Sequence, residues 1–250
     1  MTTWVLLRGL TREARHWGDF PDVMRRAMPG LRVVAPDLPG FGRRCGDPCP
    51  ARIEAIAASV REDIRRSGEA VPVHLLGLSL GAMVATEWAT SHPEEVAACV
   101  LVNTSLRAFS PFHRRLRPRN YVRLARLVIP GLTDRERESA ILQLTSARGD
   151  PGGAIVDAWT GYRRDCPVSP RSALRQLVAA QRYGGGVSPP PVPTLLLASE
   201  GDRLVDPDCS RAMAARWSVP LEIHPTAGHD LPLDDGEWVA SRIRDRVRRT

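Results

Sequence analysis

Short apolar runs alternate with amphipathic stretches along most of this chain. Six runs have the length and composition of buried strands: Trp4–Leu7, Leu31–Ala35, Val73–Leu78, Val96–Val102, Thr194–Ala198 and Leu221–His224. Between these runs and after the last one, apolar residues recur at helical spacing, most clearly at 52–66, 80–90 and 238–247. Strands that alternate with helices predict an α/β fold, with a mostly parallel central sheet of about six strands flanked by helices.

The segment 106–188 interrupts this alternation. It has no clear strand pattern, but it has helical patterns near 113–129, 134–147 and 171–183. We therefore expect one α/β core domain formed by 1–105 and 189–250, with 106–188 inserted as a helical lid over a site at the rim of the sheet. The Gly184–Gly186 and Pro189–Pro191 tracts are expected to form the hinge.

Composition places the chain among soluble globular proteins. Its 250 residues suit one α/β domain, and its 43% of hydrophobic residues is close to the usual average. No apolar run approaches the ~18 residues that a membrane span needs. Met1–Leu10 has the pattern of a strand and lacks the marks of a secretion signal, so we expect a cytoplasmic protein without a membrane partner.

The formal charge of +7 does not by itself indicate nucleic-acid binding. All 35 basic residues are arginine, which points to compositional bias, and no nucleic-acid-binding motif accompanies them. The five cysteines are scattered, so we expect free thiols. Cys45 and Cys49 are close in sequence, but no second pair at zinc-site spacing follows, and we expect no metal.

A candidate nucleophile lies where the third strand meets the next helix. Gly77-Leu78-Ser79-Leu80-Gly81 has the form G-x-S-x-G. A serine hydroxyl reacts when it is exposed and a base removes its proton, and a sharp strand-to-helix turn exposes it. The flanking glycines remove Cβ atoms that would crowd such a turn. The alternative is a small-residue turn that only packs the strand against the helix.

These features resemble the α/β-hydrolase family over nearly the whole chain. Val34-Ala-Pro-Asp-Leu-Pro-Gly-Phe-Gly42 is similar to the turn after the family's fourth strand. Ser91-His-Pro-Glu-Glu-Val96 is similar to the segment after its nucleophile helix. The family's first two strands have no counterpart, which leaves a minimal sheet of six. The most similar members are small serine esterases and thioesterases with a helical lid.

The resemblance implies a catalytic triad in the order serine, acid, histidine. Ala227-Gly228-His229-Asp230 resembles the family's Gly-His loop after the last strand, which assigns the base to His229. His224 lies within the strand pattern itself, so we expect it to be structural.

The acid is expected in Ser199–Pro207, which follows the fifth strand. Asp202 matches the family's position, whereas Asp206 lies near the start of the next helix, where capping explains it. Glu200 is a third candidate. The acid must hold one imidazole tautomer and stabilise the imidazolium, so direct contact with the base distinguishes the three.

The resemblance also implies an oxyanion hole made of two backbone N–H groups, those of Leu10 and Leu80. The family usually has His-Gly where this chain has Arg8-Gly9, so Arg8 is a departure from the family pattern. Either Arg8 binds a substrate carboxylate at the pocket, or it folds back to pair with a nearby carboxylate such as Asp37.

Arginine is abundant early in the inserted segment, at Arg107, Arg114, Arg115, Arg117, Arg119, Arg123, Arg126 and Arg135. In an arginine-biased protein such residues usually form a solvated helix face. The sharper hypothesis is a docking face for an acidic acyl carrier protein, because some small members of the family act on acyl groups held by such carriers.

We therefore predict a serine hydrolase that cleaves a small-molecule ester or thioester through an acyl-enzyme on Ser79, without a metal or organic cofactor. The same triad also supports C–C bond, lactone or amide hydrolysis and perhydrolysis, which the fold does not separate. A haloalkane dehalogenase is disfavoured because it needs aspartate at position 79. The alternative class is a non-catalytic small-molecule binder, and nucleic-acid binding rests on charge alone.

Overall fold

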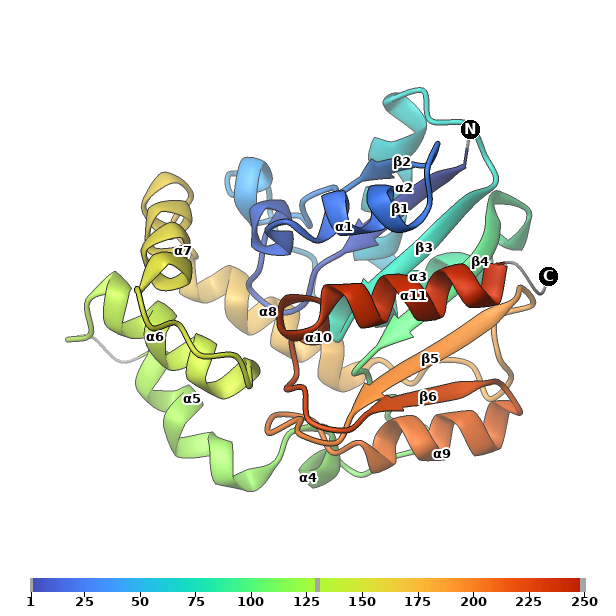
Figure 1. Cartoon of the computed structure of the whole chain (residues 1–250). Helices are drawn as coiled ribbons and strands as arrows, with labels where there is room; N and C mark the ends of the chain where they lie inside the picture. Colours follow the sequence, from blue (N-terminus) through green and yellow to red (C-terminus); the bar gives the residue numbers. More distant parts are fainter. Residues whose placement is uncertain (1, 129–130, 248–250) are drawn as a thin grey trace.

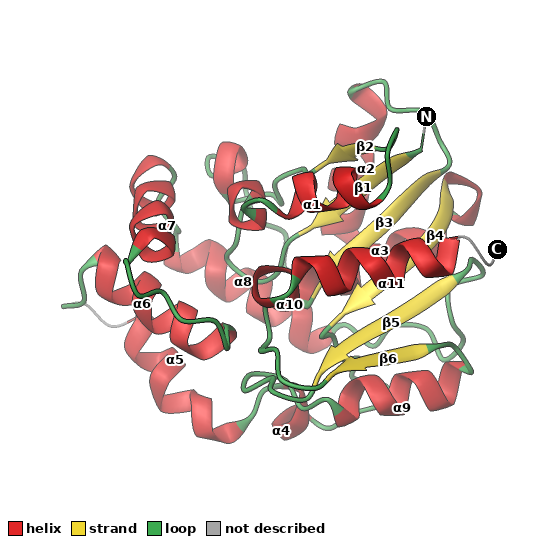
Figure 2. Ribbon diagram, in the orientation of Figure 1, coloured by secondary structure: helices red, strands yellow, loops and turns green. Residues whose placement is uncertain are grey.

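The fold is built around one parallel sheet. In the computed structural model, which describes residues 2–128 and 131–247, six strands pair in the order β2-β1-β3-β4-β5-β6, and every pair is parallel. The strands are β1 (Thr3–Leu7), β2 (Arg32–Val34), β3 (Val73–Leu78), β4 (Val96–Val102), β5 (Thr194–Ser199) and β6 (Leu221–His224). The predicted α/β fold with six strands is confirmed (Figures 1 and 2).

Helices cover both faces of the sheet, because side chains alternate along each strand. On β3, Leu76 faces the helices α1 and α11, whereas Leu75 faces α2, α3 and α9. The bounds of these helices are Phe20–Ala27, Gly236–Val247, Ile53–Arg66, Leu80–Ser91 and Asp208–Trp217, respectively. In Figure 1, α1 and α11 lie in front of the strands. Burial on both faces explains why the strands are near-continuous apolar runs in the sequence.

The helices between β4 and β5 lie beyond the carboxyl ends of the strands, toward which the arrowheads in Figure 2 point. They are α4 (Phe112–Arg115), α5 (Tyr121–Val128), α6 (Asp134–Thr145), α7 (Ala154–Asp165) and α8 (Pro170–Arg182). Leu142, Val156 and Trp159 join α6 to α7 in a small apolar cluster. This α4–α8 segment, residues 112–182, lies at the edge where parallel α/β sheets bind their ligands.

The helical pattern expected near 113–129 is found, but it is divided into α4, a 3-10 turn over Pro118–Asn120 and α5. The chain leaves helical geometry after α4 and resumes it in α5, because Pro118 has no N–H to donate and disfavours a helical residue before it. Residue 129 of that prediction lies outside the described residues. Helix α7 has no counterpart in the sequence prediction, since Gly152, Gly153 and the internal Gly161 weaken its helical signal.

Candidate active site

The backbone at Ser79 has the geometry of a strained turn. Ser79 lies between β3 and α3 with φ 57° and ψ −114°, a conformation that few non-glycine residues adopt. A Cβ on Gly77 would overlap the Gly81 carbonyl oxygen, and a Cβ on Gly81 would overlap the Leu7 carbonyl oxygen. Both glycines of the motif are therefore required by the close approach of β1, β3 and α3.

Two hydrogen bonds from the end of β4 fix this turn. The Ser79 N–H donates to the Val102 carbonyl at 2.8 Å, and the Thr104 hydroxyl donates to the Ser79 carbonyl at 2.9 Å. The nucleophile candidate is thus held at the carboxyl edge of the sheet, beneath the α4–α8 segment.

The structure brings the predicted acid and base together. His229 Nδ1 donates to Asp202 Oδ2 at 2.7 Å, and both side chains are buried. The other carboxylate oxygen, Oδ1, accepts the N–H groups of Leu204 and Val205 at 2.7 and 2.9 Å. The carboxylate thus accepts three hydrogen bonds, which hold it in place and fix the imidazole orientation that the triad requires.

The charges around His229 favour its protonated form. Burial lowers the pKa of His229, but the charge of Asp202 and its hydrogen bond, together with the charge of Asp230, raise it more strongly. Arg8 acts in the opposite direction. The net pKa lies above the ordinary histidine value, as suits a base that must accept the proton of a hydroxyl.

The alternative acid and base candidates have other partners. Asp206 accepts the N–H of Asp208 in the first turn of α9, as capping predicts, and pairs with Arg117. Glu200 is exposed and pairs with Arg211. His224 Nδ1 accepts backbone N–H groups of the next turn, so its role in β6 is structural.

The predicted oxyanion donors flank Ser79. Gly9 packs against the Ser79 side chain, since a Cβ there would lie 3.4 Å from Ser79 Cβ and 3.9 Å from its Oγ. Within the described residues, the N–H groups of Leu10 and Leu80 have no protein acceptor. No hydrogen bond joins Ser79 Oγ to His229 in the described chain, which is common before substrate binds.

Known proteins with similar sequences identify the family of this chain. The chain matches the alpha/beta hydrolase family over residues 4–242. It belongs to this family. The pimeloyl-[acyl-carrier protein] methyl ester esterase of Chromobacterium violaceum is 34% identical over 233 residues, covering 93% of this chain and 79% of that protein. Lipase LipV of Mycobacterium tuberculosis is 27% identical over 266 residues, covering 96% and 91%.

Solved structures show the same architecture. A thermophilic esterase from Thermogutta terrifontis has a TM-score of 0.76 at 24% identity, covering 100% of this chain and 90% of that chain. An esterase from Exiguobacterium antarcticum has a TM-score of 0.76 at 18% identity, covering 99% and 92%. At these identities the likeness establishes the fold. With sequence relatives named esterases and lipases, the chain is an alpha/beta hydrolase enzyme of the carboxylic ester type.

Asn103 is a site residue of this hydrolase that the sequence reasoning missed. It follows β4 with φ 45°, and its Nδ2 donates to the carbonyls of Gly228 and His229 at 3.2 and 2.8 Å and to the Ser199 hydroxyl at 3.0 Å. It therefore ties the loop of the base to β4 and β5. The available signal was the polar run 103–105 directly after a buried strand, a position where ligand-site residues concentrate.

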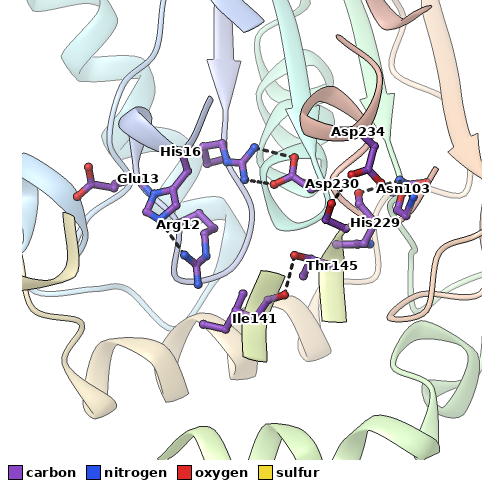
Figure 3. Close-up of polar contacts among 12 residues, drawn as sticks. Arg12, Glu13, His16, Asn103, Ile141, Thr145, His229, Asp230 and Asp234 are labelled. Carbon is purple, nitrogen blue, oxygen red and sulfur yellow. Dashed lines mark hydrogen bonds and ion pairs between the residues drawn. The ribbon is translucent and has the colours of Figure 1, made fainter. Parts of the chain in front are cut away.

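The loop of the base also contacts the α4–α8 segment (Figure 3). Asp234, in the short helix α10 (Leu231–Asp234), accepts the N–H groups of Gly228, Ala147 and Arg148 at 2.6, 2.8 and 3.2 Å. The Asp230 N–H donates to the Thr145 carbonyl at 2.7 Å. The end of α6 is thus hydrogen-bonded directly to Asp230, and Asp234 joins the turn after α6 to Gly228 on the other side of His229.

Arg8 is buried rather than exposed at an open pocket. Its Nη1 and Nη2 donate to the two carboxylate oxygens of Asp230 at 3.1 and 2.5 Å. Pairing of Arg8 with a carboxylate is therefore found, but the suggested partner, Asp37, is wrong. Asp37 instead accepts the backbone N–H groups of Ala14 and Arg43. Recognition of a substrate carboxylate by Arg8 stays a prediction.

The early arginines of the inserted segment fall into two groups. Those with partners inside the protein are Arg114, Arg115, Arg117, Arg119 and Arg135. Those exposed to solvent, with no side-chain partner within residues 2–128 and 131–247, are Arg107, Arg123 and Arg126. On α5, the side chains of Tyr121, Val122, Arg123 and Arg126 are all exposed.

Neither a membrane span nor a metal site is found in the described part of the chain. None of its helices has both the length and the apolar character needed to cross a bilayer. In the same residues, no three His, Cys, Asp or Glu side chains are grouped so that they could hold a metal ion.

Proposed function

We propose that this chain is a serine hydrolase that cleaves a carboxylic ester or thioester through an acyl-enzyme on Ser79. The observation that carries the proposal is the buried Asp202–His229 hydrogen bond, in a chain whose Ser79 is held at positive φ. Strain at a polar residue persists where the surrounding structure enforces it, and such residues cluster at reactive sites.

In the proposed mechanism, His229 Nε2 takes the Ser79 proton as Oγ attacks the acyl carbon. The N–H groups of Leu10 and Leu80 bind the oxyanion, each worth about 3–4 kcal/mol in the transition state. His229 then gives its proton to the leaving alcohol or thiol, and Asp202 stabilises the imidazolium between the two transfers. Water, activated by His229, attacks the acyl-enzyme and releases the carboxylic acid and free Ser79.

The α4–α8 segment, within the larger insertion 106–188, is proposed to act as the lid of this site. Its position beyond the carboxyl ends of the strands and its hydrogen bonds to the loop of His229 support this role. The rest of the chain, 1–105 and 189–250, is the proposed catalytic part.

The experiment that tests the function is a substrate panel. Wild type and Ser79→Ala are assayed with p-nitrophenyl esters, methyl esters and acyl thioesters of matched chain length. Turnover of at least one class by wild type, and its loss in a folded Ser79→Ala variant, is the expected result. Residual turnover within tenfold of wild type in Ser79→Ala would place the nucleophile elsewhere.

A second proposal concerns a carrier-borne substrate. One relative is named for a methyl ester on an acyl carrier protein. On this chain, α5 exposes Arg123 and Arg126, and the exposed rings of Phe112 and Tyr121 stack between α4 and α5. Exposed arginines on this part of the chain suit an acidic partner.

The test of the carrier compares a methyl ester on an acyl carrier protein with the same ester on a small thiol. Arg123→Glu/Arg126→Glu should lower kcat/KM for the carrier-bound ester about tenfold or more at low salt, and leave the small ester unchanged. The matched control, Arg65→Glu/Arg66→Glu on α2, makes the same change in net charge. Equal effects of the two double variants would exclude docking on α5.

A further inference from the structure

A buried ion pair connects the two loops on which the proposed reaction depends. Arg8 and Asp230 are 222 positions apart in the sequence, and their side chains are 3% and 4% exposed. Arg8 follows β1 and precedes Gly9, which packs on Ser79, and Leu10, the proposed oxyanion donor. Asp230 follows His229. Figure 3 shows the paired contacts that end on the Asp230 carboxylate.

The pair is built for geometry as well as charge. Two parallel N–H···O contacts at 3.1 and 2.5 Å fix both the distance and the relative orientation of the two planar groups. The Arg8 guanidinium also lies over the Trp17 ring, with Cζ 4.7 Å from its centroid. Within the described residues, both hydrogen bonds of the Arg8 side chain go to Asp230. This carboxylate is therefore the main group that offsets the cost of burying the Arg8 charge.

We infer that Arg8 and Asp230 are a positioning pair for the proposed triad. The pair fixes the loop of the oxyanion donor against the loop of the base, and it balances the charge beside His229. The inference rests on the proposed function and adds to it two residues that do not touch the reacting atoms. It gives the departure from the family's His-Gly pattern a role distinct from binding a substrate carboxylate.

The charges that reach His229 come from three loops. Asp202, after β5, and Asp230, after β6, favour the imidazolium, and Arg8, after β1, opposes it. Arg8 also faces Arg12 and His16, and its charge disfavours the protonated forms of both. Asp234 binds the Gly228 N–H on the far side of the loop. Removal of one partner of the pair should therefore move the titration of the base in a direction set by the charge that remains.

The test uses Arg8→Gln, Asp230→Asn, the double variant and Arg8→Lys, assayed with a neutral ester across pH. Arg8→Gln leaves an unbalanced carboxylate beside His229, so the acidic limb of kcat/KM should move to higher pH. Asp230→Asn leaves an unbalanced cation, so the limb should move to lower pH. The double variant should return the acidic limb toward its wild-type pH, even if this variant is less stable than wild type.

The rate constants separate positioning from binding. Each single variant should lower kcat by up to about 10²-fold, the effect of a misplacement near 1 Å, with a small change in KM. Arg8→Lys should restore the limb while only partly restoring kcat, because lysine keeps the charge without the bidentate geometry. Arg61→Gln, which breaks a bidentate pair with Glu95 between α2 and the turn before β4, is the matched control and should change neither.

Three outcomes would overturn the inference. One is an acidic limb that stays in place in both folded single variants, which would leave the pair a structural contact. Another is a shift of both variants in the same direction. The third is a KM that rises in Arg8→Gln for a half-ester of a dicarboxylic acid and not for its neutral counterpart, which would assign Arg8 to the substrate. If wild type itself cleaves no ester, the result contradicts the proposed function and not the positioning role of the Arg8–Asp230 pair.

Discussion

The two carboxylate oxygens of Asp202 bind different partners. Oδ2 holds His229, and Oδ1 is held by two backbone N–H groups. Asp202→Asn keeps the shape but replaces an acceptor with an amide that can select the wrong imidazole tautomer. We expect kcat to fall by about 10⁴, the loss seen for this change in the best-studied triad. Asp206→Asn, on the same loop, should leave kcat nearly unchanged. Greater damage from Asp206→Asn would show that the acid is misassigned.

The pH dependence of the reaction follows from the raised pKa of His229. Asp202 and Asp230 outweigh the effect of burial, so the protonated form persists to higher pH than in a free histidine. Only the neutral imidazole can accept the serine proton, so kcat/KM should rise through a midpoint above the ordinary histidine value. The stability that the charged pair contributes has the opposite trend and is lost as pH rises through the same pKa. A midpoint below that of free histidine would contradict this balance of charges.

The turn at Ser79 depends on the contact of three elements at one glycine. A methyl group on Gly81 would meet the Leu7 backbone, which cannot move without breaking the pairing of β1 and β3. Gly81→Ala should therefore cost about 3 kcal/mol or more of unfolding free energy. Gly161→Ala is the control, because Gly161 lies inside α7 with no atom within 4 Å of an added Cβ. Gly161→Ala should raise the free energy of unfolding by up to about 1 kcal/mol. Similar effects in chemical denaturation would refute the packing argument.

At the element scale, the central strands were predictable almost to the residue, and several helices were not. Strands β3, β4 and β6 have the predicted bounds, because a strand buried on both faces leaves a continuous apolar run. α7 was missed, since its apolar residues contact α6 rather than the sheet and its glycines suggest a loop. Its formation depends on tertiary packing that a single sequence does not display.

At the scale of the whole molecule, a buried charge network joins the loop after β1 to the α4–α8 segment. Glu138 on α6 accepts Arg12 Nη1 at 2.6 Å and Arg163 Nε at 2.7 Å. Arg12 also lies over the ring of Trp159, with Cζ 4.9 Å from its centroid. The network makes the position of the segment depend on a loop that carries a proposed oxyanion donor.

Glu138→Gln should disrupt this junction. It leaves the buried Arg12 guanidinium without its carboxylate partner, and the partly buried Arg163 keeps only Asp134 at 4.0 Å. Loss of one partner of a buried pair costs about 3–5 kcal/mol. We expect a lower unfolding free energy and faster proteolysis within 106–188. Asp157→Asn removes the exposed pair with Arg135 and should change stability by no more than about 0.5 kcal/mol. Equal stability of the two variants would show that the network does not hold the segment in place.

Site residues in local sequence motifs could be proposed from the sequence, whereas residues whose roles depend on distant contacts could not. The proposed triad residues, Ser79, Asp202 and His229, were candidates from the sequence because each lies in a short motif at the end of a strand. The roles of Arg8, Asn103 and Glu138 come from partners more than a hundred positions away or on other elements. Such pairings are set by how the loops pack, which no local pattern specifies.

The most direct test of the central claim is covalent labelling by a fluorophosphonate, which reacts with serine only where a base has activated it. Wild type, Ser79→Ala and His229→Ala are treated with the probe, and the modified peptide is identified by mass spectrometry. We predict one label per chain on Ser79 in wild type, none in Ser79→Ala, and far slower labelling in His229→Ala. An unlabelled wild type, or equal labelling of Ser79→Ala, would contradict it.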